Sequence, residues 1–104
     1  MSRILIVDDD NDILRFAEVL LASHGHEAVT CSSALRALEI LHTHQVDLVV
    51  IDIVMPVMDG FDLLKEIKKL PNFRAPILML TGRNATEDVR RAISLGASDY
   101  MIKP

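Results

Sequence analysis

Short apolar runs alternate with amphipathic runs along the whole chain, and this alternation restricts the fold more than any other feature of the sequence. Three runs are almost continuously apolar, as expected for strands buried on both faces of a sheet: Arg3–Val7, Asp47–Asp52 and Ile77–Thr81. Two shorter strands are predicted at Glu27–Cys31 and Asp99–Ile102. Strands that alternate with helices of about ten residues predict an α/β fold, in which right-handed crossovers place helices on both faces of a parallel sheet.

The segments between these strands are predicted to be helices. They span residues 11–23, a stretch after the N-cap candidates Ser32 and Ser33, residues 61–70, and a stretch from a capping box at Asn84 and Glu87 to near Gly96. The apolar stripe of the first helix includes Phe16 and Leu20. In the second helix, Leu35, Leu38 and Leu41 are predicted to face the sheet.

The composition is that of a globular domain. Of the 104 residues, 50 % are hydrophobic but only 4 % are aromatic, so the apolar content is aliphatic, and the mean hydropathy is +0.28. A disordered chain would be less apolar, and a disulfide scaffold would need more than the single Cys31. No stretch approaches the roughly 20 apolar residues of a membrane-spanning helix. Because no signal peptide precedes the first strand, we expect a cytoplasmic location.

Charge is distributed unevenly within a formal net charge of −4. Residues 1–60 hold ten acidic and three basic residues, a balance of −7, whereas residues 61–104 hold five acidic and eight basic residues, a balance of +3. The basic pairs Lys68–Lys69 and Arg90–Arg91 have no aromatic residues between them. We therefore interpret these pairs as solvated helix faces and expect no nucleic-acid binding by this domain.

Polar side chains follow the carboxyl ends of the predicted strands, where parallel sheets bind their ligands. They are Asp8, Asp9 and Asp10 after the first strand, Asp52 at the third, Thr81 at the fourth and Lys103 at the fifth. Two carboxylates ~4 Å apart repel by about 4 kcal/mol at an effective dielectric of about 20, so this edge needs a cation or a bound proton. Carboxylate oxygens without nearby histidine or cysteine favour Mg²⁺, or Mn²⁺, over zinc.

A carboxylate beside a divalent ion, a hydroxyl and an ammonium group can accept a phosphoryl group, because this transfer depends mainly on positioning and charge neutralisation. Asp52 is the predicted nucleophile and would form an acyl phosphate, with Thr81 and Lys103 on the phosphoryl oxygens. The alternative is that Asp8–Asp10 only cap a helix and that Asp52 only ends a strand. The histidines at positions 24, 26, 42 and 44 are interpreted as exposed residues at the opposite edge rather than as metal ligands.

The sequence resembles the receiver domain of two-component response regulators. The resemblance lies in four segments: ILIVDDD at 4–10, DLVVIDIVMPVMDG at 47–60, ILMLTG at 77–82 and GASDYMIKP at 96–104. It covers the whole chain and implies a flavodoxin-like, doubly wound parallel sheet of five strands in the order 2-1-3-4-5. It also implies a signalling protein that accepts a phosphoryl group from a sensor histidine kinase or a phosphotransfer protein. Such a domain catalyses only its own phosphorylation and dephosphorylation, and it switches conformation to control an output domain or a downstream protein.

The resemblance assigns roles to the acidic residues. Asp52 is implied to be the phosphoacceptor. Asp8 and Asp9 form the acidic pair that holds Mg²⁺ together with Asp52, Asp9 directly and Asp8 mainly through water. The backbone carbonyl of Val54 completes the protein ligands.

The resemblance also implies a switch. The hydroxyl of Thr81 moves toward the phosphoryl group, and Lys103 pairs with that group. The peptide bond from Lys103 to Pro104 is expected to be cis. The ring of Tyr100 turns inward when Thr81 moves, which would be a two-state element biased by new charge.

Two further residues are predicted to set the lifetime of the acyl phosphate. Val54 and Arg83 lie two residues beyond Asp52 and Thr81, where they would shield the acyl phosphate and slow its hydrolysis.

Two other functions compete with the receiver interpretation. A haloacid-dehalogenase-type phosphatase would carry its nucleophile after the first strand and would also contain a cap insertion, whereas the predicted nucleophile here, Asp52, ends the third strand. A pseudo-receiver would lack Asp52, Asp9 or Lys103, whereas this chain has all three. Nucleotide-binding glycine motifs do not follow any strand.

Residues 1–104 are interpreted as one receiver domain with helices 1 to 4, without the fifth helix of this family and without an output domain. Only the first helix would then cover one face of the sheet. We expect that face to be left partly bare, so that the apolar surplus of the sequence promotes self-association.

Overall fold

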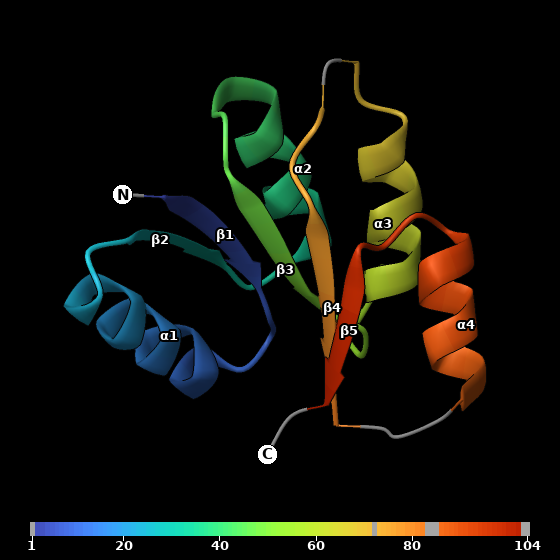
Figure 1. Ribbon diagram of the computed structural model, residues 1–104, viewed down its shortest axis with the longest axis horizontal. Helices are drawn as coiled ribbons and strands as arrows, with labels where there is room; N and C mark the ends of the chain where they lie inside the picture. Colours follow the sequence, from blue (N-terminus) through green and yellow to red (C-terminus); the bar gives the residue numbers. More distant parts are fainter. Residues whose placement is uncertain (1, 72, 83–85, 103–104) are drawn as a thin grey trace.

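The computed structural model describes residues 2–71, 73–82 and 86–102, with the backbone alone described for Thr81 and Thr86. The elements follow the order β1 (Arg3–Val7), α1 (Asn11–Ser23), β2 (Glu27–Cys31), α2 (Ala34–Thr43), β3 (Leu48–Asp52), α3 (Gly60–Lys68), β4 (Ile77–Thr81), α4 (Thr86–Ser94) and β5 (Asp99–Ile102). The strands form one parallel sheet in the order β2-β1-β3-β4-β5 (Figure 1). The predicted α/β fold and strand order are confirmed.

One face of the sheet, called here the packed face, is covered by α2, α3 and α4 (Figure 1). Successive side chains of a strand point to opposite faces, and the packed face receives Val7, Ile51 and Met79, which lie opposite one another in neighbouring strands. These residues are at most 1 % exposed. Phe61 of α3 and Ala92 of α4 belong to the same core.

The other face, called here the open face, is covered by α1 within the described residues. A smaller cluster joins Ile4 and Ile6 of β1 to Leu14, the one buried residue of α1. Leu48 and Val50 of β3 pack against this cluster but are only partly buried. The two faces therefore differ in the amount of apolar surface that helices cover.

Three of the helices begin at a side chain that accepts hydrogen bonds from the first turn. Asp10 accepts from the backbone N–H of Asp12 at 2.9 Å, and Asp59 accepts from that of Asp62 at 2.9 Å. Ser33 accepts from the N–H of Arg36 at 3.2 Å, so the predicted N-cap of α2 is confirmed. Such caps satisfy N–H groups that have no partner within the helix. The residue Asn84 of the predicted capping box lies outside the described residues.

Two details of helix orientation differ from the sequence-based expectation. In α2 the residues that face the sheet are Ala34, Ala37 and Ile40, whereas Leu35 is 57 % exposed. The prediction that Leu35 faces the sheet is therefore wrong; the small alanines occupy the contact surface and turn the leucine outward. In α1, Phe16 is also mostly exposed, although it belongs to the apolar stripe.

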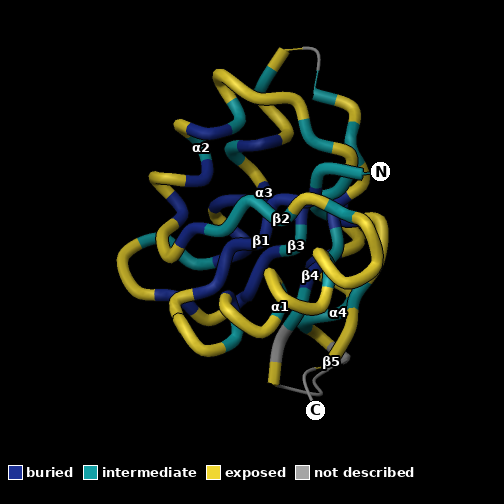
Figure 2. The backbone as a smooth tube through the Cα atoms, turned by 90° about the vertical axis from the view of Figure 1, so that its left-hand side faces the viewer, coloured by how far each residue is buried: buried dark blue, intermediate teal, exposed yellow. Residues whose placement is uncertain are grey.

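The open face has an apolar strip formed by Leu78 and Leu80 of β4 and Met101 of β5, which we call the open strip. Leu80 and Met101 are paired in the sheet, Leu78 and Leu80 are half-buried, and Met101 is 53 % exposed. Buried residues gather in β1, β3 and α3, whereas α1 is exposed along much of its length (Figure 2). None of the helices described is both long enough and apolar enough to span a membrane.

Candidate functional site

The carboxyl ends of β1 and β3 bring two aspartates together. β1 and β3 are parallel neighbours in which Val7 pairs with Ile51, so the next residues, Asp8 and Asp52, lie at the same level. Asp52 also pairs with Leu80 of β4, and the N–H of Ile53 donates to the Leu80 carbonyl at 3.1 Å. The backbone of the site is thus fixed by the hydrogen-bonded sheet rather than by loops alone.

Asp8, Asp9 and Asp52 form a cluster of carboxylates, and we use this name for the three residues below. One oxygen from each lies within 4.8 Å of those of the other two. Asp8 is 1 % exposed and Asp52 is 4 % exposed, and they are the buried charged residues of the described chain. Asp9 is exposed to solvent at the edge of the cluster. The structure therefore groups the three aspartates that the strand order predicts to converge.

The three consecutive aspartates after β1 have different local roles. Asp10 caps α1, as described above. Asp8 holds the turn, because its Oδ1 accepts from the backbone N–H of Asp10 at 2.9 Å and its own N–H donates to the Cys31 carbonyl at 3.2 Å. Helix capping thus accounts for Asp10 but not for the approach of Asp9 to Asp52.

Gly60 holds the loop after Asp52 close to the sheet, a role that the sequence analysis did not identify. A Cβ atom at this position would lie 2.5 Å from the Asp52 carbonyl oxygen and 2.7 Å from the α-carbon of Ile53. The Gly60 N–H donates to the Ile53 carbonyl at 2.8 Å, which closes residues 53–60 into a compact loop. The only signal in the sequence was a glycine directly after the N-cap Asp59, which is not specific enough to predict this contact.

The donor set of the cluster fits a hard divalent cation. It consists of carboxylate oxygens from Asp8, Asp9 and Asp52, without a histidine or cysteine. Two of these carboxylates are buried, where mutual repulsion is screened less than at the surface. A cation with two positive charges would offset this repulsion, so the residues present are suited to Mg²⁺ or Mn²⁺.

The other residues predicted at this edge are described only in part. Thr81 ends β4 opposite Ile102 of β5. It directly follows Leu80, which pairs with Asp52. Lys103, Arg83 and Pro104, with the expected cis bond, lie outside the described residues.

Tyr100 and Val54 occupy contrasting environments. Tyr100 lies on β5 opposite Met79 and is half-buried against the core of the packed face. Val54 lies two residues after Asp52 and is 55 % exposed. Among the described residues, no atom lies within 4 Å of the place that a Cβ at Gly82 would occupy.

Comparison with known proteins identifies the family. The sequence profile of the response regulator receiver domain matches residues 4–104. The chain belongs to the response regulator receiver domain family. The resemblance seen in the sequence is thereby confirmed, and the protein is a signalling domain of two-component systems.

Relatives of this receiver domain include both curated proteins and solved structures. The heme response regulator HssR of Staphylococcus saprophyticus is 41 % identical over the whole chain, which covers 46 % of that protein. The transcriptional regulatory protein AfsQ1 of Streptomyces coelicolor is 35 % identical over the whole chain, which covers 45 % of it. The structure of the chemotaxis protein CheY4 from Vibrio cholerae superposes with a TM-score of 0.95 at 30 % identity, covering all of this chain and 88 % of that one. The chain thus spans a little under half the length of these curated relatives.

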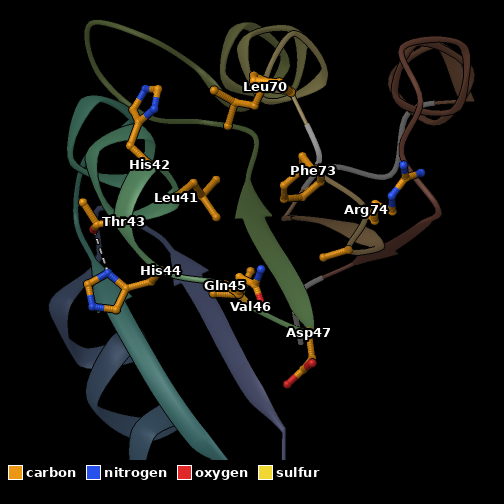
Figure 3. A pocket seen from close by; sticks show the side chains of 12 residues that line it. Leu41, His42, Thr43, His44, Gln45, Val46, Asp47, Leu70, Phe73 and Arg74 are labelled. Atoms are coloured by element: carbon orange, nitrogen blue, oxygen red, sulfur yellow. Dashed lines mark hydrogen bonds between the residues drawn. The ribbon is translucent and has the colours of Figure 1, made fainter.

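The histidines of this receiver domain lie away from the carboxylate cluster. His42 and His44 line a hollow of about 630 Å³ between the end of α2 and residues 70, 71 and 73–75, at the amino edge of the sheet (Figure 3). Leu41 and Phe73 also line it, and Thr43 Oγ1 shares a hydrogen bond of 2.8 Å with His44 Nδ1. No histidine joins a group of three metal-ligating side chains within the described residues. The hollow is therefore separate from the candidate site.

Proposed function

We propose that this domain accepts a phosphoryl group on Asp52 in a Mg²⁺-dependent reaction and changes conformation to control an output. One observation supports this function above the others: the buried carboxylate of Asp52 lies with Asp8 and Asp9 at the carboxyl edge of the sheet. Membership of the receiver family agrees with it. A phosphatase of the haloacid-dehalogenase type has no comparable support, because the carboxylates here converge from β1 and β3.

Asp52 would act as the nucleophile toward a phosphohistidine of the donor protein. One carboxylate oxygen of Asp52 forms a bond to phosphorus while the bond between phosphorus and the donor nitrogen breaks. The nitrogen keeps the electron pair of that bond and takes up a proton, and the product is an aspartyl phosphate. Hydrolysis by water later releases inorganic phosphate and restores the carboxylate. The burial of Asp52 limits the access of water to this bond.

Asp8, Asp9 and Asp52, with the backbone carbonyl of Val54, would hold the metal ion. When bound there, Mg²⁺ supplies positive charge that offsets the carboxylates and the phosphoryl oxygens. Asp8 also keeps the turn in place through the N–H of Asp10, so it links metal binding to the start of α1.

Thr81 and Lys103 would hold the other phosphoryl oxygens, and Tyr100 would respond to the movement of Thr81. The position of Tyr100 is suited to a switch, since a half-buried ring on a strand of four residues can turn with little disturbance of the core. Val54 and Arg83 are proposed to shield the aspartyl phosphate. A half-life of only seconds in the isolated domain would contradict that assignment.

The decisive experiment uses small phosphodonors. The wild-type chain is incubated with acetyl phosphate with and without Mg²⁺, and the product is measured by intact-mass spectrometry; beryllofluoride binding is followed in parallel. We expect a Mg²⁺-dependent adduct that is lost in Asp52→Asn. The matched control is Asp10→Asn, because asparagine also caps helices and Asp10 is outside the carboxylate cluster. Labelling that is absent in the wild type, or that survives Asp52→Asn, would refute the proposal.

Partners and location follow from the same proposal. The phosphodonor would be a sensor histidine kinase or a phosphotransfer protein in the cytoplasm, without nucleic-acid or membrane binding by this domain. The output would be another domain or a downstream protein; among the relatives, AfsQ1 is named a transcriptional regulatory protein.

The chain is also proposed to self-associate through the open strip of Leu78, Leu80 and Met101. Contiguous exposed apolar surface favours association in water. Sedimentation velocity over a range of concentrations is the test, with Met101→Gln as the variant, since its side chain is already half exposed. A wild-type monomer at the highest concentration would refute self-association.

A further inference from the structure

The hollow at the amino edge of the sheet has an apolar floor. Leu41 of α2, Leu70 after α3 and Phe73 before β4 lie around its centre, and Val46 also lines it (Figure 3). We call these four residues the floor. All four are half-buried, and Leu41, Val46 and Phe73 pack against the core of the packed face. The fold therefore holds the floor in place, while part of its apolar surface still contacts solvent.

The size of the hollow is that of a site for a small molecule. Its volume of about 630 Å³ lies within the range of about 300–1,000 Å³ that is typical of such sites. Residues 41–47 enclose it on one side, and residues 70, 71 and 73–75 enclose it on the other. A protein partner would need a broader surface, about 800 Å² on each side. The floor is therefore suited to the apolar group of a small ligand.

Arg74 and Asp47 place opposite charges on the rim of the hollow. Both residues are exposed and line it. Within the part of the chain that the structure describes, the side chain of Arg74 makes no ion pair or hydrogen bond. Asp47 is held by one oxygen only, because its Oδ2 accepts from the backbone N–H of Arg3 at 2.7 Å. The rim thus offers a guanidinium group and a carboxylate to a ligand.

These charges favour a ligand that carries both signs. An anion would be attracted by Arg74 but repelled by Asp47, and a cation would be attracted by Asp47 but repelled by Arg74. The helices α2 and α3 also end beside the hollow, and the last carbonyl groups of a helix carry a partial negative charge of roughly half an elementary charge. A purely anionic ligand is therefore disfavoured further, whereas a zwitterion can use both charged groups of the rim.

We propose that this hollow binds a small zwitterion with an apolar side chain, the chemistry of an apolar α-amino acid. The apolar side chain covers the floor, the carboxylate binds the guanidinium of Arg74, and the ammonium group binds the carboxylate of Asp47. The hollow lies at the opposite edge of the sheet from Asp52, so this proposal does not rest on the proposed phosphoryl transfer.

The test compares three probes that share a phenyl group. L-phenylalanine carries both charges, phenylpropionate lacks the ammonium group, and phenylethylamine lacks the carboxylate. Each is titrated into the isotope-labelled full chain at neutral pH, and binding is followed by the NMR shifts of the backbone amides.

Two variants remove one charge each from the rim. Arg74→Gln removes the guanidinium, and Asp47→Asn removes the negative charge while its side-chain oxygen can still accept from the N–H of Arg3. Arg15→Gln is the matched control, because Arg15 is also exposed but lies on α1, outside the hollow.

We expect phenylalanine to bind the wild type with a dissociation constant of about 1–5 mM, from the affinity per atom that is usual for small ligands. The largest shifts should fall within residues 41–47 and 73–75. Phenylpropionate and phenylethylamine should each bind about threefold or more weakly than phenylalanine, because exposed ion pairs have modest strength. Arg74→Gln should bind phenylalanine as weakly as wild type binds phenylethylamine, and Asp47→Asn as weakly as wild type binds phenylpropionate. Arg15→Gln should match the wild type.

Four results would overturn the proposal. They are the absence of shifts at about 20 mM phenylalanine, several times the expected dissociation constant; shifts confined to the open strip of Leu78, Leu80 and Met101; a singly charged probe that binds as tightly as phenylalanine; and unchanged affinity for phenylalanine in both rim variants.

Discussion

The two faces of the sheet differ in how completely they are covered. On the packed face, three helices contact the strands, and Leu5, Ile51 and Met79 are fully buried. On the open face, α1 contributes one buried residue, and within the described chain Leu80 stays half-buried and Met101 is exposed. Most of the apolar surface buried on folding therefore lies on the packed face.

The packed face contributes most of the stability, whereas the proposed phosphoacceptor lies on the open face. The side chains of Leu48, Val50 and Asp52 alternate with those of Val49 and Ile51 along β3, so Asp52 is on the open face. The proposed phosphoacceptor thus lies where packing is weaker and where neighbouring segments can move at lower cost. The packed face supplies the rigid frame that fixes its backbone.

Two phenylalanines provide the strongest test of this comparison. Phe61 of α3 is 2 % exposed on the packed face, and the guanidinium of Arg91 lies 4.3 Å from its ring centroid; Phe16 of α1 is 68 % exposed. We expect Phe61→Ala to lower the free energy of unfolding by about 3–5 kcal/mol, and Phe16→Ala by about 0.5 kcal/mol or less. Urea denaturation followed by circular dichroism measures both. Similar losses in the two variants would mean that α1 is packed as firmly as α3.

The loop of residues 53–60, which follows Asp52, should be sensitive to substitution of Gly60. A methyl group there would collide with the backbone at Asp52 and Ile53, which cannot move as a side chain can. Gly60→Ala should cost about 1–3 kcal/mol of stability and slow labelling of Asp52 by acetyl phosphate. Gly82→Ala is the control, because a Cβ there meets no atom of the described residues within 4 Å. If Gly60→Ala is as stable as Gly82→Ala, the close approach of the loop does not hold in solution.

Much of the sheet could be predicted from the sequence. The bounds of β1 and β2 match the prediction because short apolar runs bounded by polar residues leave few alternatives. The orientation of α2 could not be predicted, since Leu35 and Ala34 are adjacent and helical periodicity alone does not choose between neighbouring stripes.

The candidate site also has features that the sequence predicts and features that it does not. The grouping of Asp8 and Asp52 follows from strand order, because the carboxyl ends of parallel strands meet at one edge. The contact of Gly60 with the end of β3 and the positive φ of Val57 could not be predicted. Both depend on the path of a loop, and a β-branched residue argues against the backbone that Val57 adopts.

Removal of charge from the carboxylate cluster should stabilise the open face. Without divalent ions, Asp52→Asn is expected to raise the free energy of unfolding by about 1–2 kcal/mol, a fraction of the roughly 4 kcal/mol by which two charges ~4 Å apart repel at an effective dielectric of about 20. Addition of Mg²⁺ should then stabilise the wild type more than the variant, because binding to the native state alone favours folding. Thermal denaturation across a Mg²⁺ titration tests this, and an equal shift in both proteins would exclude the cluster as the metal site.

The smallest expected effect concerns Cys31, which packs with the core of the packed face. Burial raises the pKa of its thiol from 9.0 to about 11, although a hydrogen bond from the Ser33 backbone and the charge of Arg36 act in the opposite direction. A thiol that keeps its proton more tightly in the folded state contributes stability below about pH 9, and this contribution is lost as the pH rises toward 11. Wild-type stability should therefore fall more steeply than that of Cys31→Ala between these pH values, as measured by urea denaturation. Native Cys31 should also react slowly with iodoacetamide at pH 8 and rapidly in urea. Rapid alkylation of the native domain would show that this end of the packed face opens as readily as the open face.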